Sequence, residues 1–75
     1  MAPITPEFLA FLVAVDEGKR SKEYIDAVAQ YLIVNDVCTE LDLMGLTFDD
    51  LTLDHGCSAG QRAWIRRAID AANKK

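Results

Sequence analysis

Hydrophobic residues recur at helical spacing in three long stretches of this chain, which predicts three amphipathic helices. The apolar positions are Phe8, Leu9, Leu12 and Val15 in the first, Ile25, Val28, Ala29 and Leu32 in the second, and Ile65, Ala68, Ile69 and Ala72 in the third. Phe11 and Val13 add apolar surface to the first helix on almost every side. We therefore expect neighbouring elements to cover that helix widely.

Polar residues at the ends of these stretches predict where each helix starts and stops. Thr5 followed by Pro6 is a strong start for the first helix, and Gly18 ends it. Ser21 caps the second helix, and Asn35 is a suitable last residue for it. The third long helix starts at Ser58, with Gln61 three residues later as the partner in a capping box.

Two shorter helices are predicted between the second and third long ones. Asp36 can cap the first of them, which carries Val37, Leu41 and Met44 and stops at Gly45. Thr47 can cap the other, with Asp50 as an acidic capping-box partner.

Five short helices with short connections predict an all-α fold, a compact orthogonal five-helix bundle with a long C-terminal helix. No period-two alternation indicates a strand. The 75 residues suffice for one domain. We expect a flexible end at residues 1–5, the domain at 6–73 and a short tail at 74–75.

Composition narrows the class of protein. A hydrophobic content of 51% is typical of a folded core rather than of disorder. The apolar run from Phe8 to Val15 is far shorter than the ~20 residues that a membrane span needs, so no membrane association is expected. Cys38 and Cys57 form no CxxC motif, which favours a reducing intracellular location, cytoplasmic or nuclear.

The charges are unevenly distributed along the chain. Residues 1–57 contain three Lys or Arg against eleven Asp or Glu, whereas residues 58–75 contain five Lys or Arg against one Asp. The acids are densest from Asp36 to Asp54, where six occur without a single Lys or Arg. Such a division of charge favours electrostatic contact with another macromolecule.

No combination of residues indicates catalysis, a metal or a cofactor. Cys38, His55 and Cys57 are the usual zinc-ligand types, but His55 and Cys57 are too close for the usual two-residue gap and Cys38 is not tied to them. A Cys/His nucleophile needs an orienting group and a cleft, and no glycine-rich phosphate loop is present. We therefore expect a protein that is not an enzyme.

The stretch from Leu46 to Ile69 resembles the C-terminal half of a sterile alpha motif (SAM) domain. The matching positions are Leu46, Thr47, Asp50, Leu51, Gly60, Arg62, Ile65 and Ile69. Two features depart from the family pattern: Asp54-His55-Gly56-Cys57 stands where Leu-Gly-Ile is usual, and the first helix has Phe8 or Phe11 in place of a Trp.

The resemblance implies a protein-interaction module that associates head-to-tail, with itself or with a related domain, and that can polymerise. The acidic surface, from the central short helices, would comprise Glu40, Asp42, Phe48, Asp49 and Asp50. The basic surface, from the last helix, would comprise Gln61, Arg62, Trp64, Arg66 and Arg67. Phe48 and Trp64 would be apolar anchors, although either is equally consistent with the core, and the charges are also consistent with plain solvated faces.

A minority of SAM domains bind RNA hairpins, which gives an alternative function. The candidate residues are Arg62, Arg66, Arg67, Lys74 and Lys75, joined by Lys19, Arg20 and Lys22. The overall net charge of −4 opposes binding to phosphates, so nucleic acid is the less favoured partner.

Overall fold

All the secondary structure that the structure describes is helical. The structure is a computed structural model, and it describes residues 5–53 and 56–74. Its elements are α1 (Pro6–Asp16), α2 (Lys22–Val34), α3 (Glu40–Leu43), the 3-10 turn η1 (Phe48–Asp50) and α4 (Ala59–Asn73). The all-α prediction is confirmed, and those two ranges contain no strand. Outside the described residues lie residues 1–4 of the predicted flexible end 1–5, residue 75 of the predicted tail 74–75, and the corner residues Asp54 and His55.

The three long helices start at the predicted caps. The Thr5 hydroxyl accepts a hydrogen bond from the Phe8 N–H at 3.1 Å, and the Ser21 hydroxyl accepts one from the Tyr24 N–H at 3.2 Å. At the start of α4, Ser58 and Gln61 form a reciprocal capping box. Local side-chain chemistry therefore determines all three starts.

The third predicted helix starts later than expected. Asp36 does not cap it, because this residue has a φ of 62° and lies in the left-handed region. Thr39 is the cap, in a capping box with Asp42. This later start turns Leu43 towards the core and leaves Leu41, expected to be buried, 73% exposed.

The fourth predicted helix is only a single 3-10 turn, so residues 5–53 and 56–74 contain four α-helices instead of the five predicted. Thr47 and Asp50 form the predicted capping box, but the chain becomes extended at Leu51. There the Thr52 N–H donates to the Asn35 side-chain oxygen at 2.8 Å, and the Asn35 amide donates to the Thr52 carbonyl at 3.0 Å. These two bonds replace the intrahelical partners that a longer helix would have given Thr52.

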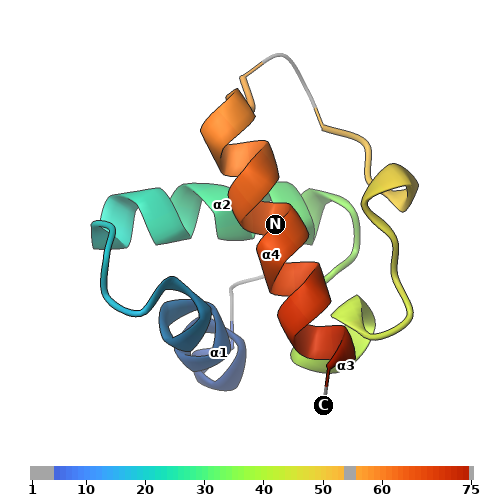
Figure 1. The fold of residues 1–75 in the computed structure, drawn as a ribbon, viewed down its shortest axis with the longest axis horizontal. Coiled ribbons are helices and arrows are strands. Elements are labelled where there is room, and N and C mark those ends of the chain that lie inside the picture. The colour runs from blue at the N-terminus through green and yellow to red at the C-terminus, as the bar shows by residue number, and fades with distance from the viewer. Residues whose placement is uncertain (1–4, 54–55, 75) are drawn as a thin grey trace.

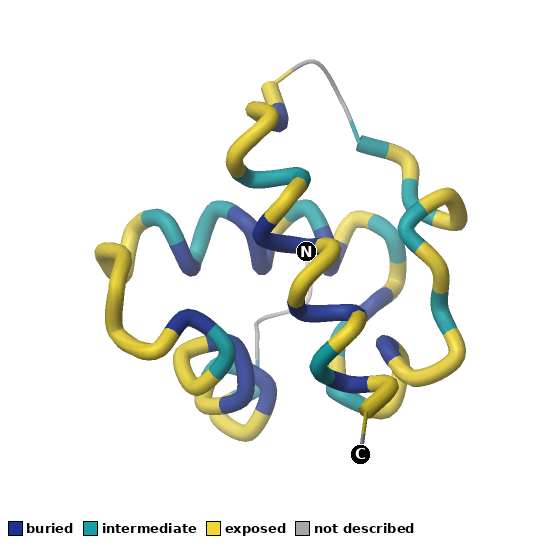
Figure 2. Tube along the Cα trace, viewed as in Figure 1, coloured by how far each residue is buried: buried dark blue, intermediate teal, exposed yellow. Residues whose placement is uncertain are grey.

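Helix α4 crosses α2 at a steep angle, and α1 and α3 lie on either side of the lower half of α4 (Figure 1). The buried residues lie where α1, α2, α3 and α4 face one another (Figure 2). The Cα radius of gyration of 11.1 Å equals the roughly 11 Å expected of a compact chain of this length.

The core contains the predicted stripes of α2 and α4, and all eight of their apolar positions are buried. Helix α1 differs from expectation. It packs against α2 and α4 on one side only, so Val13 remains 47% exposed. The wide coverage expected for this helix is found at Phe11, which is buried, but not at Val13.

Candidate functional site

The predicted acidic surface lies on α3 and η1, which occupy the same side of the molecule (Figure 1). Both elements pack against α4. Asp42, Asp49 and Asp50 are exposed, and Glu40 and Phe48 are half-buried. The structure therefore brings the five predicted residues to one region.

Two of these acids already have a role in the fold. Asp42 accepts hydrogen bonds from the N–H groups of Cys38 and Thr39, at 3.0 and 3.2 Å. Asp50 accepts one from the Thr47 N–H at 2.9 Å, and hydrogen bonding to the Thr47 backbone and side chain lowers the pKa of Asp50. Asp49 caps nothing in the described chain, so it is the acid best placed to meet a partner.

Phe48 and Arg66 contact each other within the molecule, which was not expected. The Arg66 guanidinium carbon lies 4.5 Å from the centre of the Phe48 ring, a cation–π arrangement. This contact joins η1 to the exposed side of α4. Arg66 is thus beside the acidic surface, and Phe48 is partly covered by its own chain.

Most of the predicted basic surface is also used by the fold. Gln61 completes the Ser58 capping box, and the Arg62 Nε donates to the Cys57 carbonyl at 3.2 Å. Trp64 is only 1% exposed, which places its indole in the core and removes it as a surface anchor. Its Nε1 donates to the Asp16 carboxylate at 3.0 Å.

Arg67 is the exception, and it lies beside the corner between α1 and α2. It lines a cleft of about 190 Å³ whose other charged residues are two cations and two acids: Lys19, Arg20, Asp16 and Glu17. Arg20 is held by the Asp16 carboxylate at 3.2 Å and lies over the Tyr24 ring. Lys19 pairs with Glu17 at 3.2 Å, but both side chains are exposed and such pairs are weak.

Asp16 is an important residue that sequence reasoning missed. Its carboxylate accepts from the Arg20 N–H at 2.8 Å, from the Arg20 guanidinium and from the Trp64 indole. Burial of the carboxyl acts to raise its pKa, but these hydrogen bonds and the Arg20 charge outweigh burial, so the pKa of Asp16 is lowered. The one available signal was its position, because Asp16 continues the buried series Phe8 and Leu12 at intervals of four.

The residues weighed for a metal do not come together in the described chain. Cys57 is buried and Cys38 is half-buried. Within residues 5–53 and 56–74, no three His, Cys, Asp or Glu side chains are grouped as metal ligands would be. His55 lies outside this part of the chain.

None of the described helices combines the length and apolarity needed to cross a bilayer. Comparison of the chain with protein-family models, with curated proteins and with solved structures gave no match. The function of the chain is therefore inferred from its own sequence and structure.

Proposed function

We propose that this chain is a SAM-like protein-interaction module, without catalytic activity or cofactor, that associates head-to-tail with copies of itself or with a related domain inside the cell. The acidic surface of one molecule, centred on Asp49, contacts the basic surface of the next, centred on Arg67. The long final helix, preceded by short α3 and η1 elements, supports the family resemblance.

One observation carries the proposal: Asp49 and Arg67, the predicted interface charges that the described fold does not use for its own contacts, lie at two separate places. Asp49 is on η1, whereas Arg67 adjoins Lys19 and Arg20 at the corner between α1 and α2. Figure 1 places η1 and this corner on opposite sides of α4. Two different and complementary surfaces on one molecule form a heterologous contact, which can repeat from copy to copy.

The basic surface in this proposal differs from the one expected from the last helix alone. Arg62, Arg66 and Trp64 have contacts within their own molecule. Lys19 and Arg20 lie beside Arg67, from a segment more than forty residues earlier in the chain, but Lys19 pairs with Glu17 and Arg20 with Asp16. Arg67 is therefore the cation of this surface on which the contact depends. Complementary charges of this kind steer association and determine its register.

Charge reversal tests the proposal. Asp49→Lys and Arg67→Glu should each weaken self-association roughly tenfold, equivalent to about 1.4 kcal/mol, because each places like charges in contact. Mixing the two variants should restore association, because the unchanged Asp49 of one variant meets the unchanged Arg67 of the other, and the two reversed charges are also opposite in sign. Sedimentation velocity over a range of concentrations measures both effects.

Glu7→Lys is the matched control, because Glu7 is an exposed acid in the first turn of α1, at the opposite end of that helix from Lys19 and Arg20. It makes the same charge change and should leave association unchanged. A wild-type protein that stays monomeric at every concentration would refute self-association.

RNA-hairpin binding is the second candidate. The three cations Lys19, Arg20 and Arg67 around the cleft favour it, whereas Asp16 and Glu17 in the same lining oppose it. Titration of a structured hairpin at two salt concentrations separates the two functions. RNA binding predicts an affinity that falls steeply with salt and is reduced by Arg67→Glu, with no effect of Asp49→Lys. Absence of binding at low salt eliminates this candidate.

A further inference from the structure

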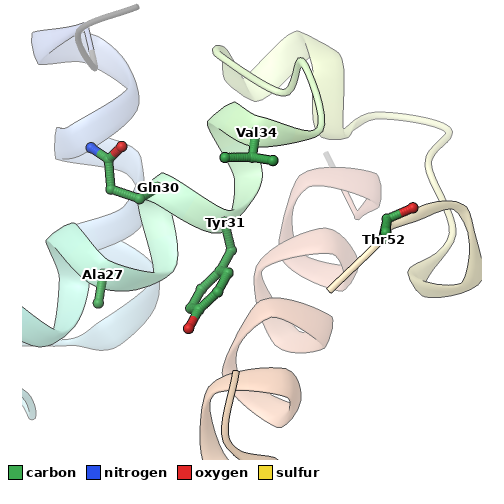
Figure 3. Close-up of a pocket in the computed structure, with 5 residues that line it drawn as sticks. All are labelled: Ala27, Gln30, Tyr31, Val34 and Thr52. Carbon is green, nitrogen blue, oxygen red and sulfur yellow. The ribbon is translucent and has the colours of Figure 1, made fainter. Parts of the chain in front are cut away.

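The outer face of α2 forms one wall of an apolar groove that the head-to-tail contact does not use. Ala27, Gln30, Tyr31 and Val34 line it at positions i, i+3, i+4 and i+7, and Thr52 lies across from them (Figure 3). The volume of about 450 Å³ falls within the roughly 300–1,000 Å³ typical of ligand sites. Val34 is 70% exposed there.

The second wall is held in place by the side chain of Asn35. This amide exchanges two hydrogen bonds with the Thr52 backbone, and its nitrogen also donates to the Tyr31 carbonyl at 2.9 Å. The extended segment that contains Thr52 is thereby fixed against the end of α2. The groove is consequently formed before any partner arrives, which lowers the entropic cost of binding.

The surroundings of the groove are acidic. Glu23 and Asp26 precede Ala27 and Gln30 by one helical turn on the same face of α2. Eight Asp or Glu and no Lys or Arg occur between Lys22 and Arg62 in the sequence. An apolar groove with an acidic border is complementary to an apolar surface with basic flanks.

A second copy of this chain does not present such a surface in its described residues. The arginines of α4 are on a helix whose apolar stripe is buried in its own core. The other exposed large apolar side chains are Leu41 and Met44, beside the acids of α3, and Val13, one turn before Glu17. The occupant is therefore a different protein.

We propose that this groove binds an amphipathic helix of a partner protein, with apolar anchors flanked by Lys or Arg. The first and last lining positions of α2, 27 and 34, are seven residues apart, or about 10 Å along the helix, which is two helical turns. A helix laid into a groove of this kind inserts side chains at i, i+3, i+4 and i+7, and the basic flanks of the ligand would face Glu23 and Asp26.

A synthetic helical peptide tests the proposal. The probe has leucines at i, i+3, i+4 and i+7 and lysines at the remaining positions, and the reference peptide replaces each leucine by alanine. In a two-dimensional amide NMR titration, the leucine peptide should shift the resonances of residues 27–34 and of Thr52, and the alanine peptide should bind at least tenfold more weakly.

Two substitutions of an exposed apolar residue by Gln distinguish binding in the groove from non-specific hydrophobic binding. Val34→Gln should weaken binding of the leucine peptide at least tenfold, because it places an amide on the groove wall. Leu41→Gln makes the same kind of change at a side chain that is equally exposed, on α3, and should have no effect.

Three results would overturn the proposal. These are no binding at millimolar peptide, equal weakening by both variants, or resonance shifts confined to the acids of α3 and η1. Sedimentation of Val34→Gln without peptide is a fourth check, because a loss of self-association there would identify a second copy as the occupant. A monomeric protein that still binds the peptide in the groove would refute the head-to-tail function alone.

Discussion

At the scale of single residues, Asp16 connects the most distant parts of the molecule. Its carboxylate is bonded to Arg20 at the corner after α1 and to Trp64 in the middle of α4. These contacts hold the corner that carries Lys19 and Arg20 against the helix that carries Arg67. The basic surface therefore depends on a buried acid that does not itself face a partner.

The lowered pKa of Asp16 predicts a dependence of stability on pH. A carboxyl whose pKa is lower in the folded state contributes stability that is present above its unfolded value, near 3.8, and is lost as the pH falls through the folded value. Asp50 contributes in the same direction. The free energy of unfolding should therefore decrease below about pH 4, as measured by urea unfolding at a series of pH values.

Asp16→Asn should make this loss of stability smaller, because it removes one of the two carboxyls, Asp16 and Asp50, whose pKa is lowered in the folded state. Asp49→Asn is its control, since Asp49 accepts no comparable set of hydrogen bonds in the described residues. An Asp16→Asn protein with the same slope of stability against pH as the wild type would contradict the account of this site.

At the scale of elements, the short η1 turn is positioned by its neighbours more than by its own hydrogen bonds. It packs on α4, where Phe48 meets Arg66, and the chain after it is bonded to Asn35 at the end of α2. A three-residue turn has too few internal bonds to be stable alone. The position of Asp49, and thus of the acidic surface, follows from these contacts.

Asn35→Ala should release the segment around Thr52. The Asn35 amide makes three hydrogen bonds, and at about 0.5–1.5 kcal/mol each their loss should lower the free energy of unfolding by roughly 1.5–4.5 kcal/mol. In an amide hydrogen-exchange experiment, the Thr52 N–H should exchange faster in the variant than in the wild type. The N–H groups at the centre of α4 should still exchange only through global unfolding. Unchanged exchange at Thr52 would show that the Asn35 bonds do not hold this segment.

At the scale of the whole molecule, one hydrophobic core joins all four α-helices. A chain of 75 residues has a modest margin of stability, because small domains bury a smaller fraction of their surface than large ones. Side chains from α2 and α4 make up most of this core. Truncation of one of these side chains should therefore lower the free energy of unfolding of the whole domain.

Leu32→Ala should lower the free energy of unfolding by about 2–5 kcal/mol, because it leaves a cavity at a fully buried position. Leu41→Ala deletes the same atoms from an exposed position on α3 and should change stability by no more than about 0.5 kcal/mol. Thermal and urea unfolding of the pair measure the difference. Similar losses in both variants would contradict the assignment of the core.

The prediction from sequence succeeded where the physics is local. Helix caps act over three residues and apolar stripes over three or four, so Thr5, Ser21 and Ser58 were identified as starts and the α2 and α4 stripes as core. The starts and lengths of the short elements were less well predicted. Asp36 was predicted to cap the third helix, but in the folded chain Thr39 caps it and Asp36 takes a left-handed conformation.

The sequence by itself thus determined an all-helical chain, its long helices and its two charged halves, because each is a property of neighbouring residues. Only the tertiary structure decided which charges remain available for a partner. Asp16 lies 48 residues from Trp64, and Asn35 lies 17 residues from Thr52. Such contacts depend on how the helices pack, so the burial of Trp64, the contact of Arg66 with Phe48 and the groove on α2 follow from that packing.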